Sequence, residues 1–394
     1  MIIPKLALRN LLGAGMKTWL NAAVLSMAYV AIIWTQGIYI GLDAEVSRAM
    51  IDAEYGGGQY WEESYDPFDP FTLQDAHLPL AGPLQNLIDQ GKATPILIVQ
   101  ATLYPGGRIV PTLLKGVDPG QKLLDLPSSV LKATDHEIPA LIGSRMSQTS
   151  GLKKGDVVTV RWRDANGTFD ARDLQIVEVM TPLDQGIDSG QVWLPLATLQ
   201  EMAGMKSQAT LVVLEKNSAP AGTISGWTFR GLDYLLKDIK SLVQAKTIGA
   251  SILYTILLFL AMLAIFDTQV LAIFKRRKEI GTIMALGFSR VKVIELFTFE
   301  GALNGVLAAV FGAIYGIPLL AYTAIRGFGL SGSQGDTFSS FGFAVSGRLY
   351  PTYSVRLVLG TIILVFVITT VVSFLPTRKI ARLKPTDALR GKLQ

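Results

Sequence analysis

The chain has 394 residues, of which 50% are hydrophobic and 17% charged, and its formal net charge is +5. Soluble domains carry about a quarter of charged residues, so this composition favours a membrane protein with apolar runs of roughly 20 residues. Cysteine is absent and there are only two histidines, His77 and His136. These counts exclude disulfides, thiolate metal sites and a cysteine nucleophile, and leave little for a histidine metal centre or a Ser-His relay. We therefore expect no catalytic residue, no metal site and no cofactor bound by this chain.

Four apolar runs predict four transmembrane helices, at residues 19–42, 248–274, 296–325 and 358–375. Each run is long enough to cross the hydrocarbon core as a helix whose backbone hydrogen bonds are satisfied internally. The first run is too long for the apolar region of a signal peptide and lacks a small-residue cleavage site. We therefore expect it to be retained as the first transmembrane helix.

The distribution of charge predicts the orientation of these helices. Residues 1–18, 275–295 and 376–394 contain 15 of the 36 Lys and Arg residues but only three acids. Short basic segments beside transmembrane helices remain in the cytoplasm. We expect a multi-pass protein of the inner (cytoplasmic) membrane with an amphipathic N-terminus, a cytoplasmic tail and both termini in the cytoplasm. The basic residues are explained by topology and by contact with membrane lipids, so no nucleic-acid partner is expected.

The same orientation places residues 43–246 outside the cytoplasm as a periplasmic domain, together with a shorter loop at 326–357. Two hairpins are predicted in the domain, around Pro105-Gly106-Gly107 and around Asn166-Gly167. We expect an α+β domain with antiparallel pairing. The predicted strands cover residues 93–103, 108–117, 156–163, 168–179, 191–195 and 209–214, and the predicted helices cover 84–90 and 196–203.

Apolar residues at helical spacing continue beyond two of the spans, after Leu42 and over residues 231–244. These stripes either form stalk helices that carry the domain or only pack against each other. Within the domain, residues 66–71 (Asp-Pro-Phe-Asp-Pro-Phe) form an acidic and aromatic cluster. We interpret the cluster as a proline-braced turn with its rings tucked in; the alternative is a contact for a substrate or partner.

Residues 275–290 predict a short helix lying along the cytoplasmic membrane surface. Basic residues anchor it at the headgroups, and Ile280, Ile283, Met284 and Leu286 supply an apolar face. Gly287 stands where this helix should end, and Ser289 can cap the helix that follows.

This sequence resembles the permease subunits of FtsX-like ABC transporters, which include the lipoprotein-release (LolC/LolE-like) permeases and the macrolide-exporter (MacB) type. The resemblance is carried by Glu279-Ile280-Gly281, Ala285-Leu286-Gly287 and Glu300-Gly301. Weaker matches are Ile142-Gly143 with residues 151–158, and Pro376, Arg378, Ala381, Pro385 and residues 387–390 in the tail. The order of one helix, a large outer domain and three helices agrees over nearly the whole chain. The unfused organisation is closest to that of the lipoprotein-release permeases.

The resemblance implies that the surface helix is a coupling helix that docks on a cytoplasmic ABC ATPase dimer. Glu279, Gly281, Ala285, Leu286 and Gly287 take this role by the resemblance. Arg277 and Arg290 either add charge pairing at its rim or serve only as topology determinants. The chain contains no G-x-x-x-x-G-K-[ST] motif, so we expect ATP and magnesium to bind to a separate ATPase chain.

Two acids lie within the predicted spans. Asp267 stands eight residues before Lys275, about 12 Å along a helix, and either gates or locks the helices or makes a structural hydrogen bond. Glu300 is expected to pair with the basic coupling segment. Three Gly-x-x-x-Gly motifs, beginning at Gly37, Gly301 and Gly312, predict close helix packing.

The leading functional hypothesis is an ATP-driven permease that couples a separate ATPase to movement of its periplasmic domain, with lipoprotein release from the inner membrane as the first choice of substrate. Export of peptides or small hydrophobic compounds through a periplasmic adaptor is the alternative, and a mechanotransmitting scaffold that regulates cell-wall hydrolases is another. Four helices are too few to enclose a large substrate, so a second permease subunit is expected, forming a homodimer or a heterodimer.

Overall fold

The computed structural model describes residues 16–132, 137–180, 190–329 and 348–378. The chain divides into two compact units. The first, called the membrane unit here, comprises residues 1–42, 242–328 and 349–394, and the second, called the α/β unit, comprises residues 43–241 and 329–348.

Four helices within the described residues are long and apolar enough to cross a membrane. They are α2 (Met16–Met50), α8 (Lys237–Lys275), α10 (Arg290–Arg326) and α12 (Val355–Thr377), and the short helix α9 (Arg277–Ala285) connects α8 to α10. Helix α2 continues past Leu42 to Met50, and α8 begins at Lys237, eleven residues before Ile248. The apolar residues at helical spacing beyond both predicted spans therefore lie in helices. A separate short helix, α7 (Leu232–Leu235), precedes α8. Helix α10 remains helical through Pro318.

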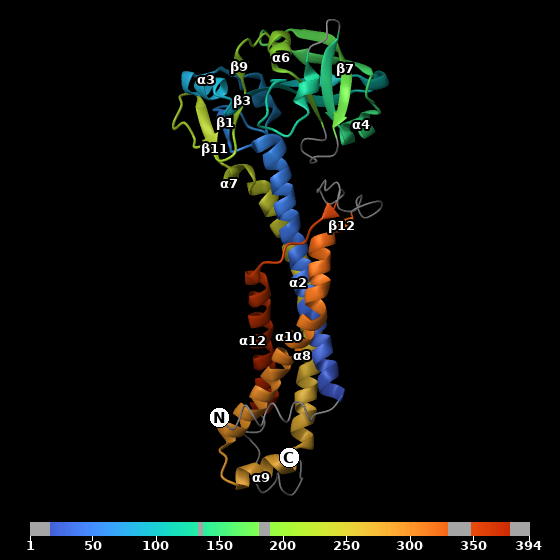
Figure 1. Ribbon diagram of the computed structural model, residues 1–394, viewed down its shortest axis with the longest axis vertical. Helices are drawn as coiled ribbons and strands as arrows, with labels where there is room; N and C mark the ends of the chain where they lie inside the picture. The colour runs from blue at the N-terminus through green and yellow to red at the C-terminus, as the bar shows by residue number, and fades with distance from the viewer. Residues whose placement is uncertain (1–15, 133–136, 181–189, 330–347, 379–394) are drawn as a thin grey trace. The chain divides into compact units, whose positions relative to one another are not determined.

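Small residues bring the helices of the membrane unit together, as the Gly-x-x-x-Gly motifs predict. A side chain at Gly301 or Gly305 would collide with Ser373 and Thr369 of α12. Gly316 faces Val30 of α2 in the same way. An apolar core then joins residues of all four helices, which run beside one another in Figure 1. Its buried members are Leu25, Tyr29, Leu258, Ala261, Ile265, Ala308 and Val365.

The α/β unit is built on one sheet, for which the described residues supply nine strands in the order β11-β1-β10-β3-β4-β8-β5-β7-β6. The bounds of these strands are β1 Gln59–Glu62, β3 Ala93–Leu103, β4 Val110–Val117, β5 Ile138–Gly143, β6 Val157–Arg163, β7 Phe169–Met180, β8 Gln191–Pro195, β10 Leu211–Leu214 and β11 Trp227–Arg230. Short helices cover it: α3 (Gly82–Asp89), α4 (Ser144–Ser150) and α6 (Leu196–Ala203). The remaining short strands pair as β2 (Leu78–Pro79) with β9 (Gln208–Ala209) and β12 (Phe328–Gly329) with β13 (Arg348–Leu349).

Six of the strands close into a ring. The last strand of the order, β6, pairs with β3 at Ala101–Leu103, so the path β3-β4-β8-β5-β7-β6 returns to its start. Alternate side chains point into this small barrel and fill it, as in other small barrels. The filling includes Leu97, Val99, Leu114, Ile142, Val160, Trp162, Leu174, Ile176, Val192 and Leu194. Strand β3 therefore belongs both to the barrel and to a three-stranded extension formed by β10, β1 and β11.

The hairpins β3–β4 and β6–β7 are confirmed, with the turns at the predicted glycines. The expectation of antiparallel pairing is incomplete, because β4 pairs with β8 and β5 with β7 in parallel. These parallel pairs join strands that are far apart in sequence, as parallel pairs must because they need long crossover connections.

Candidate functional site

The predicted coupling segment forms a distinct turn between two long helices. Arg276 has non-helical backbone angles (φ −93°, ψ 19°), which separates α8 from α9. Gly287 takes a positive φ of 96° after the end of α9. The hydroxyl of Ser289 then accepts a hydrogen bond from the backbone N–H of Lys292 at 3.4 Å and caps α10. The predicted helix, its glycine end and the serine cap of the next helix are therefore all present.

Helix α9 has one anchored face and one open face. Ile280 is fully buried and packs in a cluster with Ile273, Val293 and Phe297 of the neighbouring helices. Gly281 is also buried, which brings the backbone of α9 close to its support. The other residues carried over from the resemblance are exposed, namely Glu279, Ala285, Leu286 and Gly287. The side chain of Arg277 lies outside the described part of the structure.

One of these exposed residues is a large apolar one. The side chain of Leu286 is 78% exposed at the tip of the turn, and Phe288 is 39% exposed beside it. Basic Lys278 and Arg290 flank them and are also exposed. A protruding apolar side chain with basic neighbours is suited to bind a pocket on another protein.

A buried ion pair fixes the base of this turn. Nη1 of Arg276 lies 3.0 Å and 3.2 Å from the two carboxylate oxygens of Glu300 on α10. The Glu300 side chain is only 7% exposed. The predicted pairing of Glu300 with the basic segment is therefore confirmed. Its partner, Arg276, was missed by the sequence reasoning, because no pattern distinguishes Arg276 from its basic neighbours until the helix break is known.

The second intramembrane acid, Asp267, lies apart from this pair. Its side chain is exposed on α8, and the structure gives it no hydrogen bond or ion pair within the described residues. The polar residues next to it do have partners across helices: Thr268 accepts a hydrogen bond from Asn21 of α2 at 2.7 Å.

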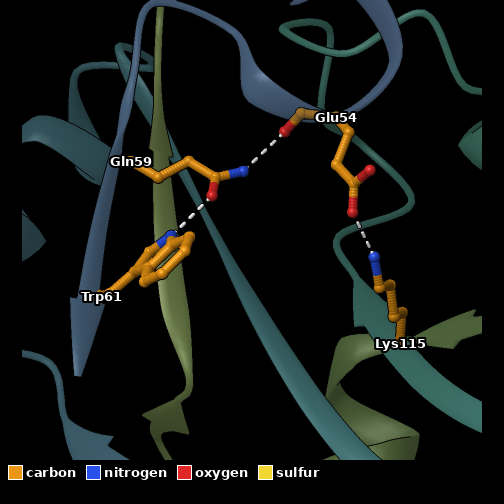
Figure 2. Close-up of polar contacts among 4 residues, drawn as sticks. All are labelled: Glu54, Gln59, Trp61 and Lys115. Carbon is orange, nitrogen blue, oxygen red and sulfur yellow. Dashed lines mark hydrogen bonds and ion pairs between the residues drawn. The ribbon is translucent and has the colours of Figure 1, made fainter. Parts of the chain in front are cut away.

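In the α/β unit, a polar cluster holds the end of the first long helix. Helix α2 passes into a short π-helix, η1 (Ile51–Tyr55), which ends at Gly56. Figure 2 shows the Glu54 carboxylate facing the ammonium group of Lys115 from β4, with which it forms an ion pair. The Lys115 side chain is 5% exposed, and its ammonium lies 5.1 Å from the ring centre of Trp193.

The same cluster also binds the backbone of η1. The side-chain amide of Gln59 donates to the carbonyl of Glu54 at 2.9 Å, and its oxygen accepts from the indole N–H of Trp61 at 2.7 Å, as Figure 2 shows. A second ion pair joins Asp52 to Lys216 at 2.7 Å. Sequence reasoning missed this cluster, since Glu54 and Lys115 are 61 residues apart and stand in no motif.

The acidic and aromatic segment at residues 66–71 forms a turn, as predicted. The carboxylates of Asp66 and Asp69 accept backbone N–H bonds from Phe68 and Phe71. The expectation that its rings are tucked in is wrong, because Phe68 and Phe71 are 79% and 90% exposed. The two prolines and the aspartate caps hold the backbone, so the turn needs no burial of the rings.

Comparison with known proteins finds a family match for the helical part of the chain that contains α9. Residues 251–385 match the family described as FtsX-like permease C-terminal. This range contains most of α8 and all of α9, α10 and α12. The chain therefore carries an FtsX-like permease domain, and its homologues are permeases of ABC transporters.

Individual relatives are similar at low identity. The chain is 24% identical over 160 residues to an uncharacterized ABC transporter permease of Methanocaldococcus jannaschii, covering 41% of this chain and 37% of the relative. It is 24% identical over 335 residues to the macrolide export ATP-binding/permease protein MacB of a Shewanella species, covering 78% of this chain and 48% of the relative. The chain thus spans half or less of the length of these curated relatives. Among solved structures, the extracellular domain of the noncanonic ABC-type transporter YknZ from Gram-positive bacteria is similar to part of this chain. The alignment covers 44% of this chain and 99% of the YknZ chain, at 14% identity and a TM-score of 0.28.

Proposed function

We propose that this chain is the membrane subunit of an ATP-driven transporter of the ABC type, and that helix α9 is its docking element for a cytoplasmic ATPase. The observation that carries the proposal is the two-sided geometry of α9. Ile280 and the Arg276–Glu300 pair fix one side to the membrane unit, while Leu286 projects from the other. An element fixed on one side and exposed on the other can transmit the movement of a bound partner to the helices behind it.

The basic residues around α9 support a cytoplasmic position for it and hence an inner-membrane protein with both termini in the cytoplasm. The α/β unit then lies on the opposite side. ATP and magnesium bind to the partner ATPase in this proposal, and two permease subunits, identical or different, form the working unit. The ion pairs and the Gln59 bond around η1 support a role for α2 in moving the α/β unit, because the end of α2 cannot shift without the sheet around it.

Two substrate classes are compatible with this arrangement. Similarity to proteins named macrolide exporters favours small hydrophobic compounds, with or without a periplasmic adaptor. The motif Glu279-Ile280-Gly281 with Ala285-Leu286-Gly287 also resembles the lipoprotein-release permeases, which favours a lipoprotein released from the membrane, the first choice from the sequence. Depletion of the protein separates the two: lipoproteins retained in the inner membrane support release, and unchanged lipoprotein sorting with higher sensitivity to hydrophobic compounds supports export.

The docking proposal is tested by purifying the tagged chain from its native membranes and measuring the ATPase that accompanies it. We expect Leu286→Asp to remove the co-purified ATPase activity, because the carboxylate desolvates poorly in an apolar pocket. Ile109→Asp is the matched control, since Ile109 is a 69% exposed apolar residue of the α/β unit. Equal ATPase recovery with Leu286→Asp and wild type would refute docking through α9.

The orientation is tested with single cysteines, which the natural sequence makes possible because it contains none. Asn166→Cys in the β6–β7 turn should react with a membrane-impermeant maleimide in cells stripped of their wall. Lys278→Cys on α9 should react only after the membrane is opened. The reverse pattern would contradict the proposed topology.

A further inference from the structure

A groove with a volume of about 380 Å³ lies between three helices of the membrane unit. Helix α2 contributes Ile32 and Ile40, α8 contributes Leu258, and α12 contributes Leu357 and Leu364. Aliphatic side chains from each helix thus form its walls. The volume is in the range of small-molecule sites, which is about 300–1,000 Å³.

A glycine in the second turn of α12 leaves space in the groove. Gly360 lines the groove, and a side chain built at this position would meet no atom within 4 Å. Glycine is unfavourable inside a helix. The other glycines of the membrane unit that pack tightly, such as Gly301, are explained by a neighbouring helix. No neighbouring helix in the described part of the structure lies close to Gly360, so its missing side chain leaves empty volume in the groove.

The polar groups of the groove walls are already hydrogen-bonded. The Gln36 amide donates to the Tyr254 hydroxyl at 3.4 Å. The hydroxyls of Thr255 and Thr361 bond to carbonyls of their own helices at 2.7 Å and 2.9 Å. These walls therefore present mainly apolar surface to whatever occupies the groove.

One end of the groove carries a positive charge. Arg356 lies in the first turn of α12 beside Ser354, and its side chain is exposed. Within the described residues Arg356 has no hydrogen bond or ion pair, and the groove lining contains no acid. A cation in the first turn of a helix is not stabilised by the helix dipole. The groove thus joins an apolar wall to an exposed cation that is available to an anion.

The position of the groove along the helices fits a lipid. Arg356 stands at the start of the 23-residue helix α12, where a membrane-spanning helix meets the headgroups. Tyr254 lies 21 residues before Lys275 on α8, about 31 Å along the helix. The groove is therefore at the opposite end of the bundle from α9, which is the outer leaflet under the proposed orientation.

We propose that this groove binds one acyl chain of an anionic phospholipid of the outer leaflet, with the phosphate of the headgroup at Arg356. The guanidinium of Arg356 and the hydroxyl of Ser354, at the end of the groove, suit a single phosphate. A lipid in this position contacts three of the four helices and so stabilises their mutual packing. Only the choice of leaflet rests on the proposed function.

The groove is tested by filling it. Native mass spectrometry of the full chain in detergent, titrated with phosphatidylglycerol, measures binding directly. Gly360→Leu should lower the affinity by about tenfold, because an added side chain occupies the space and overpacking is costly. Gly249→Leu on α8 is the matched control: Gly249 is also an open helical glycine but does not line the groove. Equal loss in both variants, or no loss in either, would overturn the proposal.

The headgroup assignment is tested by charge. Wild type should prefer phosphatidylglycerol over phosphatidylcholine by about fivefold, the effect of one cation on an anionic lipid. Arg356→Gln should remove this preference and leave phosphatidylcholine binding unchanged, while Arg356→Lys should retain it. An equal preference in Arg356→Gln, or stronger binding of a neutral diacylated lipopeptide than of phosphatidylglycerol, would overturn the assignment. A wild-type chain that recovers the ATPase but binds no phosphatidylglycerol would refute this inference alone. A wild-type chain that binds phosphatidylglycerol but recovers no ATPase would refute the docking proposal alone.

Discussion

Two buried ion pairs hold the ends of two long helices, one in each unit of the molecule. In the α/β unit, Lys115 holds Glu54 at the end of α2. In the membrane unit, Arg276 at the end of α8 holds Glu300. Both pairs join residues from different elements, and both are shielded from solvent. They differ in what surrounds them.

The end of α2 is fixed several times over. Besides the Lys115 pair, Gln59 binds its carbonyl, Lys216 binds Asp52, and the turn at Gly56 is pressed against the sheet. Among the described residues, the turn that contains α9 has fewer such contacts, chiefly the Arg276 pair and the buried side chain of Ile280. This difference predicts that the end of α2 tolerates the loss of one contact better than the turn at α9 does.

The largest effect is expected at the rigid end. Lys115→Met leaves the Glu54 carboxylate unpaired in a site where it is 16% exposed, which should cost about 3–5 kcal/mol of unfolding free energy. The double variant Lys115→Met/Glu54→Gln should recover most of the loss, because no buried charge remains. The measurement is denaturant unfolding of the full chain, followed by tryptophan fluorescence. A double variant no more stable than the single one would show that the ion pair is not what Lys115 contributes.

The turn that contains α9 should respond to truncation of one apolar side chain. Ile280→Ala should cost about 2–3 kcal/mol locally, since the side chain is fully buried in a small cluster. Hydrogen exchange should then show faster exchange of the amides of α9 without global unfolding. Leu286→Ala is the control and should leave exchange within about 0.5 kcal/mol, because the side chain is exposed. Unchanged protection in Ile280→Ala would mean that α9 is held as redundantly as α2.

The glycine turn after η1 sharpens the comparison further. Gly56 has a φ of 54°, and a side chain there would lie 2.3 Å from the carbonyl oxygen of Leu214. Gly91 has a φ of 70° but open space around it. Both alanine variants carry the strain of a positive φ, about 1–3 kcal/mol, and only Gly56→Ala adds a backbone collision. Thermal unfolding should therefore rank Gly56→Ala below Gly91→Ala, and equal stabilities would show that the close approach is not needed.

The smallest effect concerns an exposed pair on the barrel. A hydrogen bond from the ammonium of Lys154 lowers the pKa of the Glu178 carboxyl below its ordinary value of 4.5. A lowered pKa in the folded state means that the pair contributes stability above the ordinary pKa, and that this contribution is lost as the pH falls through the lower value. Side-chain carbon NMR of labelled glutamate should show the pKa of Glu178 returning upward in Lys154→Ala. An unchanged pKa would assign the shift to another cause.

Much of the architecture follows from local patterns in the sequence. The strands β3 and β8 and the helix α6 have the predicted bounds, because alternation and periodicity act within a single element. The four spans are likewise visible as long apolar runs, two of which contain one acid each. The Glu300 pairing was predicted from its charge, but identifying Arg276 required the backbone break after Lys275.

What the sequence did not reveal depends on distant contacts. Closure of the barrel joins β3 to β6, about 60 residues later, through only three residues of pairing. Strands β1 and β11 are short and were not predicted, because each is specified by its neighbours in the sheet. The site formed by Glu54 and Lys115 likewise exists only after the sheet is assembled, and the open space at Gly360 depends on the packing of three helices. The side chain of Arg277 lies outside the described part of the structure. The tail residues of the family pattern beyond residue 378 lie outside it entirely.

The pairing of β1 also sets an order on assembly. Gln59 pairs with Val213 and with Arg230, so the strand that follows α2 must wait for residues made some 150 positions later. At 5–20 residues per second, this is a delay of roughly 8–30 seconds during synthesis. Throughout that interval α2 can enter the membrane without its anchor, and Glu54 has no sheet to enclose it. The anchor at the end of α2 therefore forms only after β10 and β11 have been made, although α2 itself is the first long helix of the chain.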